Sequence, residues 1–374
     1  MIMASRDFQV FIKPAGPDCN LCCSYCYYLP KKSEYHKGHL YRMSYDLLET
    51  YIQQHIDATE ADEIRFSWHG GEPTLVGLDF YRKAVRLQEK HCPVGKKIYN
   101  AMQTNGVLLD DEWCVFLGEN GWSVGLSLDG PPDLHDLYRR TRDNGPTYEY
   151  VLKGYRLLQR YGVPTDILCV VNNRNSRAPL EVYSHFKEIG AEYITFIPLV
   201  EHHGGVVDEI SVTPDSWGSF LCRVFDEWVG NDVGKIRVQI FEEAIRAALG
   251  QDHLLCLFKP VCGMVPVVEH NGDYYACDHF VDRNHCLGNI AETPLKKLLG
   301  CDEQLGFGLD KAKLPDLCRD CSVLGMCNGG CMKNRFVEAS GGLLNYLCRG
   351  YREFFTHIEP FSRQVARLMD RSGF

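Results

Sequence analysis

The sequence lacks long apolar runs and an excess of positive charge. No stretch approaches the roughly 20 apolar residues of a membrane-spanning helix, and the first seven residues show no signal-peptide core. Lys and Arg number 40 against 49 Asp and Glu, whereas nucleic acids and anionic membranes are bound by concentrated Lys and Arg. These absences argue against a membrane, secreted or nucleic-acid-binding protein, and we expect a cytoplasmic location.

Common nucleotide-binding motifs are also missing. Neither G-x-G-x-x-G nor G-x4-G-K-[ST] occurs, which argues against a dinucleotide-binding dehydrogenase or a kinase. The 45% apolar and 24% charged residues are ordinary for a globular chain, and 374 residues suffice for two domains or for one barrel with an appendage. No internal repeat, low-complexity tract or disordered linker is evident.

Cysteine is present in unusual number, with 18 residues. In a cytosolic chain, such cysteines more often bind metal or serve redox chemistry than form disulfides. Four of them stand alone in helical or strand-like stretches and are interpreted as small buried apolar residues: Cys92, Cys114, Cys169 and Cys222. The others fall into groups with short, regular gaps, which predicts metal or cluster sites.

Short β-rich runs alternate with helical patterns up to about residue 200. Strands are predicted at Phe8–Pro14, Glu63–Trp68, Lys97–Met102, Trp122–Leu128, Thr165–Val171 and Tyr193–Pro198. Helices are predicted near 45–57, 78–91, 109–119, 147–161 and 179–189. This α/β alternation predicts parallel strands with right-handed crossovers, in a doubly wound sheet or a barrel, whole or partial. Both folds place ligands beyond the carboxyl ends of the strands.

The pattern changes beyond about residue 213. Helices are predicted at 213–229 and 239–249, before a segment from Cys256 to Cys348 that holds ten of the 18 cysteines. Residues 265–277, with Asn271-Gly272 at their centre, predict a β-hairpin. The rest of this segment is rich in loops, so we expect metal rather than packing to hold it. A final helix near 350–371 is expected to pack back on the barrel.

Three cysteines follow the first predicted strand with the spacing C-x3-C-x2-C: Cys19, Cys23 and Cys26. Three thiolates on one loop can bind three irons of a [4Fe–4S] cube and leave the fourth iron open to a non-protein ligand. Zinc is the alternative, but it favours four ligands, and the loop contains no His. Cys22 does not fit this spacing and is not expected to be a ligand.

This loop, with Tyr25 before its last cysteine, resembles the radical S-adenosylmethionine (SAM) superfamily. The resemblance implies a partial (β/α)6 barrel in which the open iron binds SAM, so that an electron from the cube cleaves SAM to methionine and a 5′-deoxyadenosyl radical. It also implies SAM contacts from Tyr25, from the GGEP motif and from residues at later strand ends: Gly70, Gly71, Glu72, Ser127, Arg139 and Leu199. An ordinary Gly-rich turn and a solvated Arg139 are the alternatives. The neighbouring His202 and His203 are expected to be exposed to solvent.

The late cysteines suit two four-ligand sites, but their spacing leaves the partition open, because Cys318 to Cys331 could close one site unaided. Their pattern resembles the SPASM domain. The resemblance implies one [4Fe–4S] cluster on Cys256, Cys262, Cys277 and Cys331, and another on Cys318, Cys321, Cys327 and Cys348. Two structural zinc ions are the alternative, and Cys286 and Cys301 are expected to be free thiols. The implied domains are a barrel over 1–235, a SPASM domain over 236–348 and a C-terminal helix over 349–374.

Asp278 directly follows Cys277. A carboxylate beside a buried cluster is expected to be desolvated, with its pKa raised toward that of a useful base, and a turn-capping Asp is the alternative. With the other motifs, the Cys277-Asp278 pair resembles the anaerobic sulfatase-maturating enzymes.

This second resemblance implies that a Cys or Ser in a C/S-x-P-x-R segment of a sulfatase is oxidised to formylglycine. Asp278 would take the thiol or hydroxyl proton, and the remaining electron would leave through an auxiliary cluster. Tyr28 and His69 are candidates to line the substrate pocket, with core packing as the alternative for Tyr28. An electron donor such as ferredoxin or flavodoxin is expected.

Two other functions fit part of the pattern. A SPASM maturase that crosslinks ribosomal peptides is the nearest, but many of these begin with a peptide-recognition domain, and only 18 residues precede Cys19. A zinc-binding scaffold that holds partners through its cysteine-rich tail is the alternative of another class.

Overall fold

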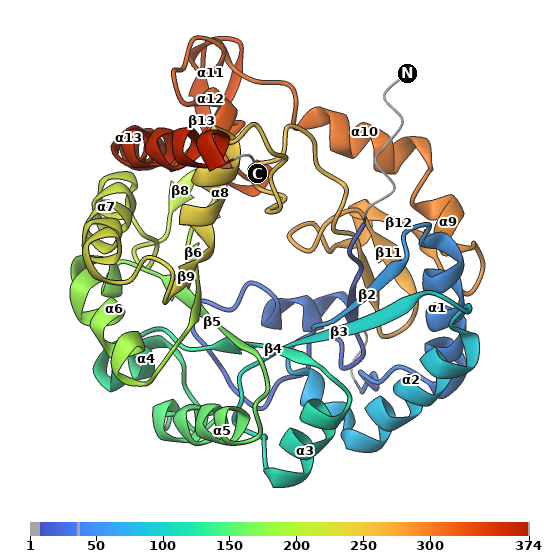
Figure 1. The fold of residues 1–374 in the computed structure, drawn as a ribbon. Helices are drawn as coiled ribbons and strands as arrows, with labels where there is room; N and C mark the ends of the chain where they lie inside the picture. The colour runs from blue at the N-terminus through green and yellow to red at the C-terminus, as the bar shows by residue number, and fades with distance from the viewer. Residues whose placement is uncertain (1–7, 36–37, 373–374) are drawn as a thin grey trace. The chain divides into compact units, whose positions relative to one another are not determined.

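The computed structural model describes residues 8–35 and 38–372 (Figure 1). Residues 1–7, in which no signal peptide is expected, lie outside the described part. The chain forms two compact units. Of the described residues, those within 1–126, 139–165 and 263–308 form unit 1, and those within 127–138, 166–262 and 309–374 form unit 2.

Unit 1 is built on parallel strands. They are β1 (Phe11–Lys13), β2 (Glu63–Trp68), β3 (Lys97–Thr104) and β4 (Ser123–Ser127), and each pairs in parallel with the next. The accompanying helices are α1 (Tyr45–Ala58), α2 (Leu78–His91), α3 (Asp111–Glu119) and α5 (Tyr148–Arg160). The side chains of Ser44 and Asp110 cap α1 and α3, as Ser and Asp do at helix starts. These elements confirm the predicted strands and helices to within a few residues.

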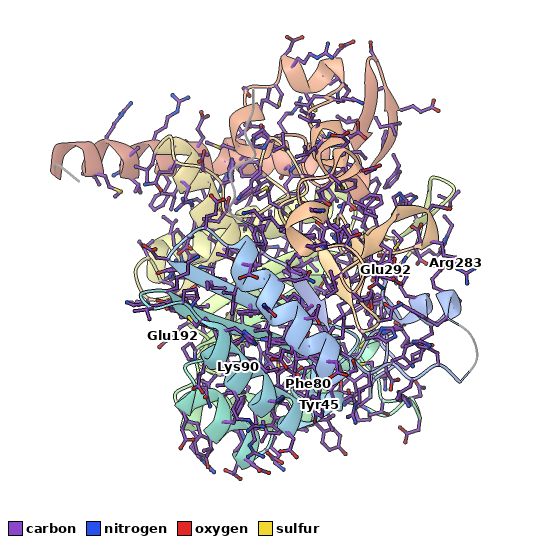
Figure 2. All side chains as sticks on the ribbon, turned by 90° about the vertical axis from the view of Figure 1, so that its right-hand side faces the viewer. Tyr45, Phe80, Lys90, Glu192, Arg283 and Glu292 are labelled. Carbon is purple, nitrogen blue, oxygen red and sulfur yellow. The ribbon has the colours of Figure 1, made fainter. Side chains whose placement is uncertain are left out.

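The core of unit 1 lies between the strands and their helices. Ile64, Phe66 and Trp68 of β2 are buried, whereas the alternating Glu63 and Arg65 are exposed. The helices α1 and α2 also meet at their N-terminal ends, where the rings of Tyr45 and Phe80 stack with centroids 6.2 Å apart (Figure 2). The buried sheet therefore gives the loops at its carboxyl end a firm base.

The predicted hairpin is present and extends the sheet of unit 1. Strand β10 (Val267–Glu269) pairs in parallel with β1, β11 (Asp273–Tyr275) pairs antiparallel with β10, and β12 (Cys286–Asn289) with β11. Gly272 closes the turn with a φ of +91°, which a residue without a Cβ adopts readily. The sequence did not indicate the parallel pairing of β10 with β1. This pairing places the segment that follows β11 close to β1.

Unit 2 continues the β/α alternation. Strands β5 (Thr165–Val171), β6 (Tyr193–Pro198) and β9 (Arg237–Val238) pair in parallel. The helices are α4 (Pro132–Tyr138), α6 (Pro179–Glu188), α7 (Pro214–Asn231), α8 (Gln239–Ala248) and α13 (Cys348–Ser372). Helix α13, the predicted final helix, packs against α7 and α8, and a Cβ on Gly218 of α7 would come within 2.9 Å of the Gly350 backbone.

The cysteine-rich tail contains more regular structure than the expected loops. Its helices are α9 (Leu295–Leu298), α10 (Asp302–Asp310), α11 (Asp316–Arg319) and α12 (Leu324–Cys327), and β13 (Arg335–Ala339) pairs with β14 (Gly342–Asn345). The loop-rich expectation was wrong here because elements of four to nine residues show no clear periodicity.

Small elements complete the chain. These are the 3-10 helices η1 (Leu29–Glu34), η2 (Pro73–Val76), η3 (Asn175–Arg177), η4 (Arg283–His285) and η5 (Met332–Asn334), and the short pair β7 (His202–His203) and β8 (Val206–Val207). Among residues 8–35 and 38–372, no helix is both long and apolar enough to cross a membrane.

Candidate active site

The cysteine loop between β1 and α1 brings the three expected ligands together. Burial raises the pKa of the Cys19 thiol to about 12, and nearby Glu72, Cys23 and Cys26 add to the shift. Thiols so close together must lose their protons to bind metal, and a bound cation compensates the thiolate charge. Cys22, by contrast, is exposed, and its amide donates to the carbonyl of Arg140.

Within the described residues, no three His, Cys, Asp or Glu side chains converge on a single-ion site. The ligands of a [4Fe–4S] cluster bind different irons at its corners, so they do not need to converge on one point. The donor set of the loop, three thiols and no imidazole, therefore fits an iron–sulfur cube.

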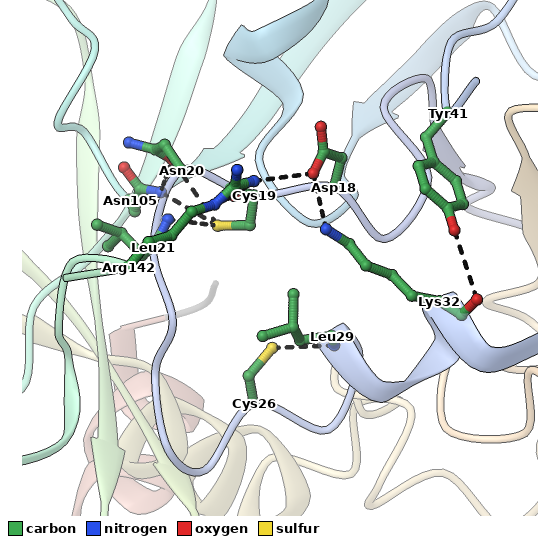
Figure 3. A network of polar contacts seen from close by, with 10 residues as sticks. All are labelled: Asp18, Cys19, Asn20, Leu21, Cys26, Leu29, Lys32, Tyr41, Asn105 and Arg142. Atoms are coloured by element: carbon green, nitrogen blue, oxygen red, sulfur yellow. Dashed lines mark hydrogen bonds and ion pairs between the residues drawn. The ribbon is translucent and has the colours of Figure 1, made fainter. Parts of the chain in front are cut away.

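Charged side chains hold the loop in place (Figure 3). The Arg142 guanidinium donates to the Cys19 carbonyl, with a distance of 3.0 Å from Nε, and pairs with Asp18 at 2.9 Å. Asp18 also pairs with Lys32 at 2.8 Å. These partners lower the pKa of Asp18 against the opposing effect of burial. The arrangement fixes the backbone from which Cys19 projects.

Several N–H groups point at the loop sulfurs. The amide of Leu21 donates to Cys19 Sγ at 3.4 Å, and the amide of Leu29 donates to Cys26 Sγ at 3.3 Å. The side-chain amide of Asn105, at the end of β3, lies 3.7 Å from Cys19 Sγ (Figure 3). Hydrogen bonds to cysteine sulfurs are among the factors that set the reduction potential of an iron–sulfur cluster.

The GGEP motif packs directly on the cysteine loop. The Gly71 amide donates to the Gly16 carbonyl at 2.7 Å, and the Glu72 amide donates to the Asp18 carbonyl at 2.8 Å. A Cβ on Gly71 would lie 2.1 Å from the Asp18 oxygen, so only glycine fits. Gly70 has a φ of +147°, which also favours glycine. The structure thus shows a close approach of backbone to backbone, and the approach of these glycines to SAM stays a prediction.

Glu72 links this motif to the end of β3. Its buried carboxylate accepts from the amide and hydroxyl of Thr74, from the Thr104 hydroxyl at 2.7 Å and from the Asn105 amide at 2.8 Å. Burial raises the pKa of Glu72, and these donors oppose the shift. The expected contact of Glu72 with the SAM amino group stays a prediction.

Two of the other expected SAM contacts lie at strand ends, whereas Arg139 follows helix α4, so its expected place at a strand end is wrong. Arg139 is only 7% exposed, so it is not a solvated surface charge, and its guanidinium lies 5.4 Å from the Tyr25 ring centroid. Ser127 and Leu199 belong to unit 2, where Ser127 ends β4 and the buried Leu199 follows β6. Of the two histidines expected to be exposed, His202 instead stacks on Phe336 at 3.9 Å.

Asp278 forms a polar cluster with residues from β1 and the cysteine loop. The ammonium of Lys13, which is 1% exposed, pairs with its carboxylate, and the Tyr27 hydroxyl donates to its second oxygen. Burial alone would raise the pKa of Asp278, but the charges of Lys13 and His279 and the hydrogen bonds lower it to about 2. The expected raised pKa is therefore wrong, because the neighbouring cation outweighs desolvation. The described carboxylate contacts also differ from those of a turn cap.

Lys13 and Tyr27 were missed by the sequence reasoning. A single cation at the end of the apolar strand Phe8–Pro14 was the available signal, because a buried Lys is rare unless it is paired. No comparable signal singled out Tyr27 from its neighbours. The partner of Lys13 could not be read from the sequence, because the parallel pairing of β1 with β10 was not evident.

The two candidate substrate residues are both largely enclosed. Tyr28 is 2% exposed, donates to the buried Glu269 and lies under Lys13, whose Nζ is 3.5 Å from its ring centroid. His69 stacks on Phe11 at 3.7 Å, and burial lowers its pKa to about 3, so the imidazole is neutral. Their roles toward substrate stay predictions.

The tail thiols form two groups in unit 2. Burial and the charges of Cys331 and Cys262 raise the pKa of Cys256 to about 11, which places these three together. The other group lines one small pocket: Cys318, Cys321, Cys327 and Cys348. Cys277, the fourth ligand expected for the first group, follows β11 in unit 1. Ligation itself stays a prediction, as do the domain boundaries at 235/236 and 348/349.

Comparisons with known proteins agree with this geometry. Residues 14–185 match the model of the radical SAM superfamily, and residues 256–322 match that of the SPASM iron–sulfur cluster-binding domain. A serine-type anaerobic sulfatase-maturating enzyme of Bacteroides thetaiotaomicron is 42% identical over 96% of this chain and 91% of its own length. A cysteine-type enzyme of Clostridium perfringens is 34% identical, with 96% and 98% covered.

A solved structure is also similar. Native anSMEcpe with bound AdoMet aligns with a TM-score of 0.88 and 33% identity, over 96% of this chain and 99% of that chain. The predicted fold class, a partial (β/α)6 barrel followed by a cysteine-rich SPASM domain, is confirmed by this likeness.

Proposed function

Because the chain belongs to the anaerobic sulfatase-maturating enzymes of the radical SAM superfamily, we propose that Asp278, held by Lys13 and Tyr27, is the base with which it makes formylglycine. The chain is an oxidoreductase that uses SAM and [4Fe–4S] clusters. We propose as substrate a Cys or Ser in a C/S-x-P-x-R segment of a sulfatase. The single observation that carries the role of Asp278 is its enclosed carboxylate, which contacts a buried cation and a residue of the cysteine loop.

The loop residues would hold the first cluster and SAM. Cys19, Cys23 and Cys26 supply the thiolates, and the GGEP motif with Arg139 lies on the same unit. When bound, SAM and this cluster supply a 5′-deoxyadenosyl radical that abstracts a hydrogen atom from the substrate Cβ. The buried Glu72 and the Asp18–Arg142 pair keep the loop in position for that chemistry.

Asp278 then accepts the thiol or hydroxyl proton. Its low pKa suits this step, because loss of the Cβ hydrogen makes the adjacent S–H or O–H far more acidic, so a weak base suffices. Lys13 keeps the carboxylate anionic until the proton arrives, and Tyr27 fixes its orientation. Removal of one hydrogen atom and one proton leaves one electron to depart as the C=S or C=O bond forms. An auxiliary cluster held by the tail thiols would accept that electron, and water would hydrolyse a thioaldehyde to the aldehyde with release of hydrogen sulfide.

We propose a cytoplasmic location for this chemistry. All 18 cysteines lie among the described residues and are free thiols there, a state that suits a reducing compartment. We propose a one-electron donor such as ferredoxin or flavodoxin, because each SAM cleavage needs one electron. The crosslinking peptide maturase and the zinc scaffold are set aside by the relatives' shared function over most of the chain.

Replacement of the base tests the assignment. Asp278→Asn should keep its iron and still form 5′-deoxyadenosine, whereas formylglycine should fall by about 10²- to 10⁴-fold, as expected for loss of a general base. The assay is anaerobic incubation with C-x-P-x-R and S-x-P-x-R peptides, SAM and a reductant, read by mass spectrometry. Asp282→Asn, in the same loop but paired with His285, is the matched control. Normal peptide turnover by Asp278→Asn would remove Asp278 from the mechanism.

A further inference from the structure

Arg335, at the start of β13, donates only to backbone carbonyls in its described hydrogen bonds. Nε lies 3.0 Å from the Gly329 oxygen, Nη1 lies 2.7 Å from the Lys311 oxygen, and Nη2 lies 2.9 Å from the Asn328 oxygen and 3.4 Å from the Gly330 oxygen. Three of these acceptors are consecutive in the chain. The guanidinium is thus enclosed by carbonyl dipoles, and no carboxylate neutralises it within the described part of the chain.

The acceptor segment is shaped for this cation. Asn328, Gly329 and Gly330 all have positive φ values, of 46°, 72° and 64°. A Cβ on Gly329 would lie 2.6 Å from the guanidinium, so the side chain and the bend fit each other only with glycine there. Asn345 supports the bend by donating to the Gly329 carbonyl at 3.3 Å. Glycine adopts such φ values readily and asparagine tolerates them better than most other residues, so the sequence Asn328-Gly329-Gly330 suits this bend.

The bend joins the two groups of tail thiols. It leads from Cys327, in one group, to Cys331, in the other. Arg335 interacts electrostatically with thiols of both groups, namely Cys262 and Cys331 of the first and Cys318 and Cys327 of the second. Its guanidinium therefore lies within electrostatic reach of both groups of thiols.

A fully buried cation in the same tail provides a contrast. Lys311 is fully buried and donates to the carbonyls of Cys256 at 2.6 Å and Leu257 at 2.9 Å. The thiols with the largest electrostatic effect on it belong to the first group: Cys262, Cys256 and Cys331. The corresponding thiols for Arg335 come from both groups.

We propose that Arg335 is a positioning residue whose single positive charge is shared by the two auxiliary clusters and raises the reduction potential of both. Reduction adds negative charge to a cluster, and a nearby cation in a low-dielectric surrounding stabilises that charge. Both clusters would then accept the substrate electron more readily. The inference rests on the proposed function and on the two groups of tail thiols described with the candidate active site.

The test uses a full-length background in which Cys19, Cys23 and Cys26 are replaced by Ala, so that only the tail clusters remain. This background should bind about eight irons per chain, the content of two [4Fe–4S] clusters. Arg335→Gln removes the positive charge, whereas Arg335→Lys keeps the charge but loses the branched set of N–H donors of the guanidinium. Arg237→Gln is the control, because Arg237 is exposed and pairs with Glu242. Midpoint potentials are measured by redox titration followed by EPR.

Both midpoint potentials should become more negative in Arg335→Gln, move less in Arg335→Lys and stay unchanged in Arg237→Gln. Unchanged potentials in Arg335→Gln, or a shift of only one cluster, would overturn the shared role. Arg335→Gln could also lose iron from both sites. In that case, retention of iron by Arg335→Lys would support a role for the positive charge, and loss of iron from Arg335→Lys as well would overturn the proposal. A background without tail iron would overturn the ligand sets and this inference together, without touching the role of Asp278.

Discussion

The two cysteine-rich regions of this molecule stabilise positively charged side chains in different ways. Beside the loop thiols of unit 1, Lys13 pairs with the carboxylate of Asp278. Among the tail thiols of unit 2, Lys311 and Arg335 are held by backbone carbonyls. A cation with a carboxylate is a neutral pair that can take part in proton transfer. A cation held only by dipoles favours an additional anion, such as a thiolate-bound cluster.

The regions also differ in where their thiols come from. Cys19, Cys23 and Cys26 lie on one loop, whereas the tail thiols come from several short elements between Cys256 and α13. The loop is therefore held by the sheet beneath it, and the tail by contacts that form only when the whole region is folded. In this molecule, the cation of the site proposed to transfer a proton pairs with a carboxylate, whereas the cations of the sites proposed to bind electron-transfer clusters are held by backbone carbonyls.

The largest effect should come from removing one ligand in each region. Cys19→Ala should abolish formation of 5′-deoxyadenosine and retain about eight of roughly twelve irons. Cys327→Ala should lose about four irons yet still cleave SAM, while formylglycine falls because the electron acceptor is damaged. Iron assays and chromatography of 5′-deoxyadenosine measure both outcomes. Loss of SAM cleavage in both variants would contradict the assignment of SAM cleavage to the loop cluster alone.

A smaller effect is expected from replacing the cation of unit 1. Lys13→Met leaves the Asp278 carboxylate buried without its partner, a change that costs about 3–5 kcal/mol in other proteins. Peptide oxidation should fall by about 100-fold with SAM cleavage intact.

The pH profile gives this variant a specific signature. Lys13 now holds the pKa of Asp278 at about 2, so the carboxylate is charged at all higher pH values. Without that cation, burial raises the pKa, and the acidic limb of the rate profile should move to higher pH. Lys13→Arg keeps the charge and should preserve the profile. An unchanged acidic limb in Lys13→Met would show that Lys13 does not control Asp278.

The smallest effect concerns the free energy of unfolding, to which a buried pair in unit 2 contributes. This contribution should fall as pH rises, whereas the activity that depends on Asp278 should fall as pH drops. His253 Nδ1 lies 2.8 Å from the buried Glu243 carboxylate. Burial alone lowers the pKa of His253, but its hydrogen bonds to Glu243 and to the Gly325 carbonyl raise it above the usual value. The stability that this pair contributes is therefore fully present below the unfolded pKa of about 6.5 and is lost as pH rises through the folded pKa.

Glu243→Gln should remove about 2 kcal/mol of this stabilisation at acidic pH and little at alkaline pH. Chemical unfolding at pH 6 and pH 9, under anaerobic conditions, measures the difference between the two proteins. Parallel pH dependences would exclude the His253–Glu243 pair as the titrating element, and the contrast with Asp278 would then be lost.

Local patterns predicted much of this molecule. The bounds of β2, β5 and β6 followed from buried β-rich runs, and the cysteine loop followed from short spacing. What escaped prediction depends on distant contacts. The Lys13 pair needs the pairing of β1 with β10, and the pKa of Asp278 had the wrong sign because its cation was unknown. Arg335 looked like an ordinary charge because its carbonyl partners are set by backbone conformation.

The parallel pairing of β1 with β10 also bears on how the enzyme matures during synthesis. Asp278 follows Tyr27 by 251 positions, so a nascent chain exposes the loop and Lys13 long before their carboxylate partner emerges. A lysine is poorly accommodated in a closed interior without that partner. The free edge of β1 should therefore stay unpaired until the β10–β11 hairpin has been synthesised. A chain truncated before this hairpin would lack Asp278 and could not complete the oxidation.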